Sequence, residues 1–266
     1  MGATAEELRA FAVAVAREAG QLTLRYFRGE FDVESKSDDT PVTRADREAE
    51  LLVRRRIRET WPDDDILGEE FGVDAGRGGR TWVIDPIDGT KSFVAGAPLY
   101  GVLVAAVEGR YGGGELDTAR VVAGVIHVPP LAETVSAARG GGALWDAGDG
   151  RERVASVSGH DTLGGARVTT SDFADFHRRE PKLAARVDEA SALARTWGDA
   201  YGYLLVATGR LDAMIDPIVS PWDIAPLPVI IEEAGGRFTD LEGRLLLAPS
   251  AMGTNGRIHD ALLRER

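Results

Sequence analysis

Hydrophobic residues near the N-terminus recur every three or four positions, which is the period of an amphipathic helix. The positions on this apolar face are Leu8, Phe11, Val15, Ala19, Leu22 and Tyr26. The pattern predicts a helix to about Arg28 and a second helix between a Thr43 cap and Pro62. We interpret the basic run at 54–58 in the second helix as a solvent-exposed face.

From residue 81 the apolar segments become short and rich in β-branched residues, as is typical of strands. The strands predicted there are 81–84, 100–107, 120–128 and 134–138. After about residue 150 the two patterns alternate, with strands at 167–170 and 211–215, helices at 181–193, 200–208 and 224–234, and then a strand and a terminal helix. This order predicts a layered protein of α and β elements, with a mixed sheet first and alternating units second.

The composition is that of an ordinary globular protein, with 44% hydrophobic and 28% charged residues. At 266 residues we expect one domain of two lobes, about 1–150 and about 151–266. The net charge of −12 argues against nucleic acid and an anionic membrane as partners. The absence of cysteine excludes disulfides and thiolate catalysis. Neither a secretory pattern nor a long apolar run occurs, so the cytoplasm is the expected location.

The first predicted strand of this series leads at once into the segment DPIDGT at residues 85–90. Its two carboxylates, Asp85 and Asp88, suit hard cations such as Mg²⁺ because no cysteine or histidine lies nearby. Gly89 and Thr90 open a segment that can start a helix, whose free N–H groups favour phosphate. A simple chain reversal is the alternative, because Asp-Pro and Asp-Gly are both common in turns.

Three other acidic segments also allow two interpretations. Glu69 and Glu70 follow a short apolar run, where paired acids are ordinary surface residues. Asp46 and Asp223 each stand in the first turn of a predicted helix, where an acid complements the helix dipole. Each acid is also a candidate metal or catalytic residue.

Taken together, these segments resemble the inositol monophosphatase family of Mg²⁺-dependent, lithium-sensitive phosphatases. The matching segments are Gly68-Glu69-Glu70, residues 82–90 with Phe93, Trp222-Asp223 with Ala225, Lys36, Thr43 with Asp46, Ala207-Thr208-Gly209 and Glu233-Ala234-Gly235-Gly236. The resemblance covers the chain from end to end and in order. It implies a layered α-β-α-β-α sandwich, a homodimer, two or three Mg²⁺ ions with Mn²⁺ as a possible substitute, and inhibition by Li⁺.

The resemblance also assigns the metal ligands. It implies that Glu69, Asp85 and the carbonyl of Ile87 hold the first ion. Asp85 would bridge to a second ion completed by Asp88 and Asp223, and Glu69 would share a third, weaker one.

The remaining catalytic and phosphate-binding roles come from the same resemblance. Thr90 and Asp46 would form the dyad that orients the attacking water, with Glu69 as a further catalytic residue. The N–H groups of Gly89 and Thr90 would hold phosphate oxygens, and Lys36 would add positive charge.

The substrate prediction depends on the segment 195–203 and on Asp216. The candidate substrate-binding residues are Arg195, Gly198, Asp199, Ala200, Asp216 and Asp223. Asp199 stands where inositol-preferring relatives usually carry a small neutral residue, and two carboxylates suit a cationic leaving group. The segment is similar to the histidinol-phosphatase branch, which implies hydrolysis of L-histidinol phosphate in histidine biosynthesis.

Several alternatives stay open. Asp199 is also explained as a first-turn acid of the following helix. The substrate alternatives are inositol 1-phosphate and a broad range of sugar or nucleotide phosphates. A more distant alternative is a non-catalytic regulator that binds metal or phosphate, although such a protein does not need a water-orienting dyad.

Overall fold

The computed structural model of the chain describes residues 2–29, 33–35, 41–111, 117–247 and 249–265. Lys36 and the glycines at 112–114 therefore lie outside the described residues. The described helices are α1 (Ala5–Thr23), α2 (Arg44–Thr60), α3 (Thr90–Val94), α4 (Phe173–Arg179), α5 (Pro181–Ala190), α6 (Ala200–Ala207), α7 (Pro221–Ile224), α8 (Leu227–Glu233) and α9 (His259–Arg264).

The described strands form three sheets. The largest has the order β10 (Glu152–Val154), β9 (Gly142–Asp146), β8 (Glu133–Ala138), β7 (Val121–Val128), β6 (Gly101–Glu108), β5 (Arg80–Asp88), β3 (Asp65–Gly68) and β4 (Gly72–Asp74). The second has the order β12 (Leu193–Arg195), β11 (Arg167–Thr169), β13 (Ala213–Asp216), β15 (Ala251–Thr254) and β14 (Arg237–Thr239). A small hairpin pairs β1 (Val33–Ser35) with β2 (Pro41–Thr43).

Alternating side chains of the large sheet build two hydrophobic cores, because successive residues of a strand point to opposite faces. Trp82 and Ile84 of β5 pack with α1 and α2 on one face. Val83 of β5 and Leu103 of β6 lie in a separate core with α6 and α8 on the other face. The central strands are therefore apolar on both sides.

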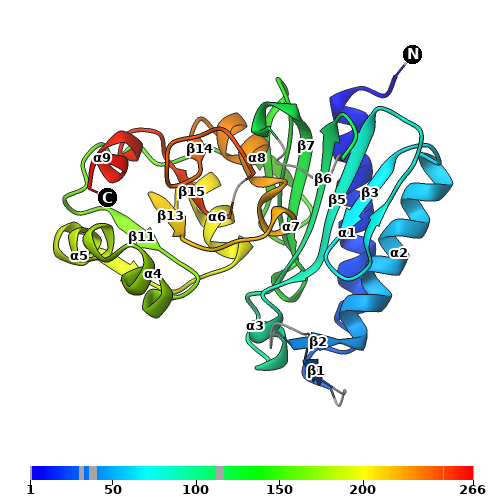
Figure 1. Cartoon of the computed structure of the whole chain (residues 1–266), viewed down its shortest axis with the longest axis horizontal. Coiled ribbons are helices and arrows are strands. Elements are labelled where there is room, and N and C mark those ends of the chain that lie inside the picture. Colours follow the sequence, from blue (N-terminus) through cyan, green and yellow to red (C-terminus); the bar gives the residue numbers. More distant parts are fainter. Residues whose placement is uncertain (1, 30–32, 36–40, 112–116, 248, 266) are drawn as a thin grey trace.

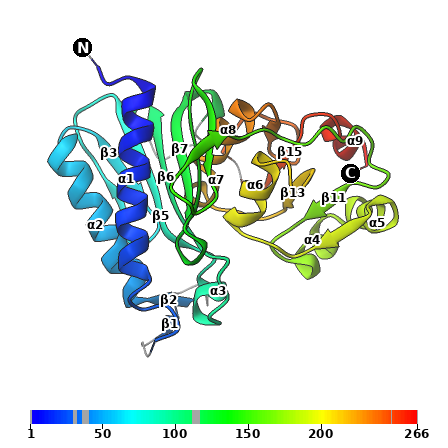
Figure 2. The same cartoon turned by 180° about the vertical axis from the view of Figure 1, so that it is seen from behind.

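A third core covers the far face of the smaller sheet. Val168, Ala213 and Met252 of its strands pack there with Leu183 of α5 and Leu262 of α9. The layers then run from α1 and α2 through the large sheet, α6 and α8, and the smaller sheet to α4, α5 and α9 (Figures 1 and 2). This arrangement confirms the predicted α-β-α-β-α sandwich.

Three element predictions need correction. The helix predicted at 224–234 begins at Leu227 as α8, and a separate short helix, α7, ends at Ile224, since Pro226 has no N–H to continue the hydrogen-bond ladder between them. The first helix ends at Thr23 rather than near Arg28, which has a left-handed φ of 61°. The helix predicted at 181–193 ends at Ala190, and the chain then forms strand β12.

The prediction of a solvent-exposed basic face on α2 is wrong for Arg54. Its side chain is buried and its Nε lies 2.7 Å from Oε1 of the fully buried Glu50, one turn earlier. A charge at this depth is stable because it is paired.

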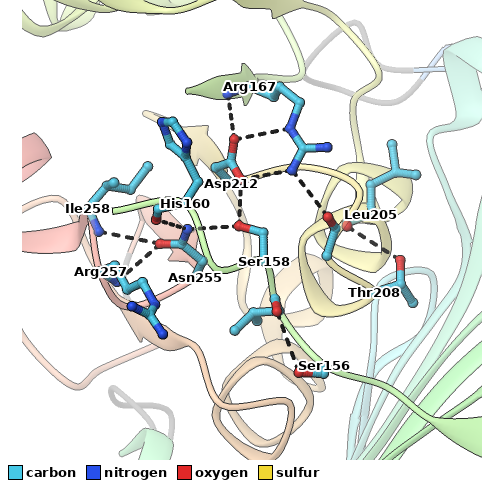
Figure 3. Close-up of polar contacts among 12 residues, drawn as sticks. Ser156, Ser158, His160, Arg167, Leu205, Thr208, Asp212, Asn255, Arg257 and Ile258 are labelled. Atoms are coloured by element: carbon cyan, nitrogen blue, oxygen red, sulfur yellow. Dashed lines mark hydrogen bonds and ion pairs between the residues drawn. The ribbon is translucent and has the colours of Figure 1, made fainter. Parts of the chain in front are cut away.

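A buried polar network ties the segment after the large sheet to the smaller sheet (Figure 3). Asp212, which precedes β13, accepts hydrogen bonds from the Arg167 N–H at 2.7 Å and from the Ser158 hydroxyl. Asn255 donates to Oγ of Ser158 at 2.9 Å and to the carbonyl of His160 at 2.7 Å. Burial would raise the pKa of Asp212, but the bonds from Arg167 and Ser158 outweigh it and lower that pKa.

None of the helices in the described ranges combines the length and the apolar character needed to cross a membrane.

Candidate active site

Strand β5 delivers two carboxylates to one place through an irregularity in its pairing. Asp85 pairs with Leu103 of β6 and Asp88 with Gly101, so three steps on β5 match two steps on β6. Residues three apart in a regular strand point to opposite faces, whereas an extra residue re-aims the following side chain. Pro86, which lacks a ladder donor, lies in this irregular stretch.

The parallel pairing of β3 with β5 brings Glu69 beside Asp85. Gly68 pairs with Ile84, and the N–H of Glu69 donates to the Ile84 carbonyl at 3.3 Å. A hydrogen bond between the carboxyl groups of Glu69 and Asp85 is among the causes that raise the pKa of Asp85.

A buried glutamate of α2 fixes the loop that carries Glu69. Glu50 accepts hydrogen bonds from the N–H groups of Glu70 at 2.7 Å and Phe71 at 3.2 Å. A Cβ on Gly68 would lie 2.1 Å from Oε1 of Glu50, so only glycine fits between the helix and this loop.

Asp223 completes a three-carboxylate cluster from the opposite half of the chain. Oxygen atoms of Asp85, Asp88 and Asp223 all lie within 4.8 Å of one another. Asp223 stands in α7, where its Oδ2 accepts the Ser220 N–H at 2.8 Å in a capping box. Cap and cluster are therefore built by the same side chain.

Burial and mutual repulsion raise the pKa of each carboxyl group in this cluster. The pKa of Asp85 is raised by burial and then by Glu69, and that of Asp88 by burial and then by Asp199. Burial raises the pKa of Asp223 to about 7.

The cluster fits a divalent cation. Oxygens of Asp85, Asp88 and Asp223 lie within 4.8 Å of one another and Glu69 lies against Asp85, so these four acids would repel one another unless protons or cations neutralise them. All the donors are oxygen atoms, the kind that Mg²⁺ and Ca²⁺ prefer, and Ile87 lines the same cavity. The residues present therefore match a hard divalent ion.

Helix α6 begins at the cluster in an unusual backbone conformation. The N–H of Ala200 donates to Oδ2 of Asp88, and the N–H of Asp199 donates to Oγ of Ser171 at 3.0 Å. Asp199 has φ 54° and ψ −156°, a region that residues other than glycine rarely adopt and that costs about 1–3 kcal/mol. Gly198 is required by its neighbour, since a Cβ there would lie 2.4 Å from Cα of Ser171.

Asp216 lies deeper than Asp199 and its oxygens already have partners. Oδ1 accepts the Ser171 N–H at 2.9 Å and Oδ2 accepts the Tyr203 hydroxyl at 3.0 Å. Burial raises the pKa of Asp216 to about 6 despite these bonds. Burial followed by the charge of Asp216 also raises the pKa of Asp199 to about 6, and Lys91 opposes this shift.

The carboxylate cluster and Asp199 line a cavity of about 400 Å³. Its described lining is Glu69, Asp85, Ile87, Asp88, Gly89, Thr90, Lys91, Ser92, Ser171, Asp172, Asp175, Asp199, Ile218 and Asp223. A smaller cavity of about 90 Å³ shares Asp88, Ser171 and Asp199 and adds Ala200, Tyr203 and Asp216. The candidate site thus has a main chamber and an acidic side pocket.

Asp46 and Thr90, the predicted dyad, are not joined directly in the described residues. Oδ2 of Asp46 accepts the Thr43 N–H at 2.8 Å, and the Thr90 hydroxyl donates to the Ile87 carbonyl at 3.2 Å. Oδ1 of Asp46 is buried without a hydrogen-bond partner. Burial raises the pKa of Asp46 to about 6.

Arg195 does not line this cavity. It lies at a separate surface hollow of about 540 Å³, together with Phe173, His177 and Asp188, and its Nη1 donates to the Ala194 carbonyl at 2.7 Å.

Several residues that build the site were absent from the predicted set. Lys91 lines the cavity directly after Thr90, Glu50 anchors the Glu69 loop, and Ser171 and Tyr203 hold Asp199 and Asp216. The sequence did contain a signal for Glu50, because this residue follows Asp46 by one helical turn and so lies on the same face of the helix. The sequence contained no such signal for Ser171, since only the folded structure brings this residue to the start of α6.

The comparisons with known proteins agree with this geometry. The model of the inositol monophosphatase family matches residues 4–266, and the chain belongs to that family.

Among curated proteins, the chain is 42% identical to a histidinol-phosphatase of Chlorobaculum parvum, over 92% of this chain and 93% of that protein. It is 39% identical to a histidinol-phosphatase of Mycobacterium tuberculosis, over 95% of each chain. Among solved structures, the Thermotoga maritima IMPase has a TM-score of 0.82 and 33% identity, covering 96% of this chain and 94% of that one.

Proposed function

We propose that this protein is a Mg²⁺-dependent phosphomonoesterase that hydrolyses L-histidinol phosphate to L-histidinol and phosphate. The observation that carries the substrate choice is the pair of carboxylates, Asp199 and Asp216, beside the three-carboxylate cluster. The names of the curated relatives from Chlorobaculum parvum and Mycobacterium tuberculosis support the same choice. The cytoplasmic location and the homodimer stay predictions.

In this proposal the oxygen atoms of Glu69, Asp85, Ile87, Asp88 and Asp223 would hold Mg²⁺. Bound divalent cations supply polarisation of the phosphoryl group and a lower pKa for the attacking water. The protein's own contribution is to gather these oxygens from β3, β5 and α7 at fixed positions.

Two further residues would orient the attacking water. The Thr90 hydroxyl lies at the cavity wall, and Oδ1 of Asp46 is a buried acceptor without a partner. To take this role, the Thr90 hydroxyl would give up its hydrogen bond to the Ile87 carbonyl. The N–H groups of Gly89 and Thr90, together with Lys36, would hold the phosphate oxygens.

The leaving group would enter the side pocket. Histidinol phosphate carries an ammonium group near its ester oxygen, and Asp199 is the more accessible of the two carboxylates there. Asp216 acts behind it, since Ser171 and Tyr203 occupy its oxygens. Each charge-assisted hydrogen bond to the ammonium would contribute about 1.5–3 kcal/mol.

The test is phosphate release from a panel of esters, with kcat/KM measured with and without Mg²⁺ and Li⁺. L-histidinol phosphate should be the best substrate, and Asp88→Asn should abolish turnover while leaving the fold intact. Asp199→Thr should reduce kcat/KM for histidinol phosphate more than for inositol 1-phosphate. Equal losses for both esters would remove the basis of the substrate choice.

Inositol 1-phosphate is the second candidate substrate. An inositol-1-monophosphatase of Mesorhizobium japonicum is 33% identical to this chain over 95% of it. If inositol 1-phosphate gives the higher kcat/KM in the panel, this candidate replaces the first.

A further inference from the structure

The main cavity is far more acidic than a phosphate site can tolerate without compensation. Among the described residues that line it, Lys91 is the single lysine or arginine. The acids that line it are Glu69, Asp85, Asp88, Asp172, Asp175, Asp199 and Asp223. Divalent ions would neutralise the cluster at Asp85, Asp88 and Asp223, but Asp199 lies outside that cluster.

The carboxylate of Asp199 lies against the turn from which Lys91 projects. A Cβ built on Gly89 would be 2.6 Å from Oδ2 of Asp199, so this oxygen nearly touches the glycine two residues before Lys91. Gly89 therefore needs to be glycine for this contact as well as for its φ of 84°. The lysine and the carboxylate share one wall of the cavity.

The position of Asp199 is held by the protein, whereas that of Lys91 is adjustable. The strained backbone of Asp199 is fixed by its bond to Ser171 and by the following bond from Ala200 to Asp88. Lys91 is exposed at the start of α3, and a lysine has a flexible four-carbon stem. The positive charge of Lys91 also lowers the pKa of Asp199 against the larger effects of burial and Asp216.

We propose that Lys91 determines specificity by changing its electrostatic partner: its charge offsets that of Asp199 across the shared wall of the cavity in the free enzyme, and it moves to the substrate phosphate when a cationic leaving group occupies Asp199. This inference rests on the proposed function and deepens it. The favoured substrate class is a phosphate monoester whose alcohol carries a cation a few bonds from the ester oxygen. A neutral polyol phosphate brings no cation to Asp199. Lys91 then stays near Asp199, and the substrate phosphate loses its contact with the lysine.

The experiment compares L-histidinol phosphate with its des-amino analogue in the Mg²⁺-loaded enzyme. Lys91→Met should lower kcat/KM for the amine-bearing ester at least fivefold more than for the analogue. Lys91→Arg keeps the charge and should retain most of the selectivity. Lys182→Met removes another exposed lysine, on α5, and should change neither value.

The Asp199→Asn variant tests whether the effect of Lys91 depends on the Asp199 carboxylate. The carboxylate of Asp199 no longer attracts Lys91 there, so Lys91 contacts the phosphate of either ester. Adding Lys91→Met in that background should reduce kcat/KM equally for the two esters.

Two outcomes would overturn the inference. The selectivity is the ratio of kcat/KM for L-histidinol phosphate to kcat/KM for its des-amino analogue. If Lys91→Met leaves this ratio unchanged, Lys91 binds phosphate whatever the leaving group is. A selectivity that rises would mean that Lys91 only screens Asp199. If histidinol phosphate is hydrolysed in either case, only this inference fails, whereas no hydrolysis of either ester would refute the proposed function as well.

Discussion

Replacing Asp223 by asparagine should stabilise the metal-free protein and weaken its response to Mg²⁺. Oxygen atoms of Asp85, Asp88 and Asp223 lie within 4.8 Å of one another. Two unit charges at that separation repel by about 3.5 kcal/mol at an effective dielectric constant of about 20. Protonation of the neighbours limits the relief, so we expect a gain of about 2 kcal/mol in the free energy of unfolding in EDTA. Asparagine keeps an oxygen that can accept the Ser220 N–H, so the cap of α7 is preserved.

In Mg²⁺ the substitution should instead reduce the stability that the ion adds. A ligand at one hundred times its dissociation constant stabilises a folded protein by about 2.7 kcal/mol. If losing one carboxylate weakens binding about a hundredfold, the same Mg²⁺ concentration gives the variant only about 0.4 kcal/mol. The variant should therefore be the more stable protein in EDTA and lose most of the Mg²⁺-induced gain.

The assay is thermal unfolding followed by circular dichroism at pH 8, in EDTA and in Mg²⁺. A gain of about 2 kcal/mol corresponds to a rise in Tm of about 4 °C for a chain of this size. Asp161→Asn, at an exposed acid outside the cavity, is the matched control and should change neither Tm. If Asp223→Asn is less stable than the natural protein in EDTA, the acids do not repel one another as the structure implies.

Three further predictions concern pH, the Glu69 loop and the polar network. The folded-state pKa of Asp223 is raised to about 7 from about 3.9 when unfolded, so ionisation opposes folding. The pKa values of Asp85 and Asp88 are raised as well, so the Tm in EDTA should fall as the pH rises from 4 through 7, and Mg²⁺ should reduce the fall. Glu50→Gln removes charge-assisted bonds to the Glu69 loop and leaves the buried Arg54 without its charged partner, so it should cost about 3 kcal/mol in denaturant unfolding and weaken Mg²⁺ binding, whereas the exposed Glu59→Gln should do neither. Asp212→Ala removes the acceptor of the Arg167 N–H and of the Ser158 hydroxyl and should cost about 2 kcal/mol, with kcat per folded molecule unchanged; a loss of kcat would connect the network to the site.

The sequence by itself determined the elements and the identity of most acids. Apolar periodicity located α1, α2 and the central strands, because burial of one face or both leaves a period that can be read along the chain. The DPIDGT segment indicated metal and phosphate chemistry because carboxylates at a strand end before a glycine turn are chemically distinctive. The element ends were less predictable, as at Pro226, where one missing N–H divides a continuous apolar pattern.

Only the tertiary structure decided which groups meet. The irregular pairing of β5 turns Asp85 and Asp88 toward one cavity, although an alternating strand would separate them. The contact between Asp199 and Gly89 joins segments 110 residues apart, and neither segment alone contains a pattern that predicts it. Local pattern records the burial of each residue, whereas a shared pocket arises from long-range packing, which leaves no period in the sequence.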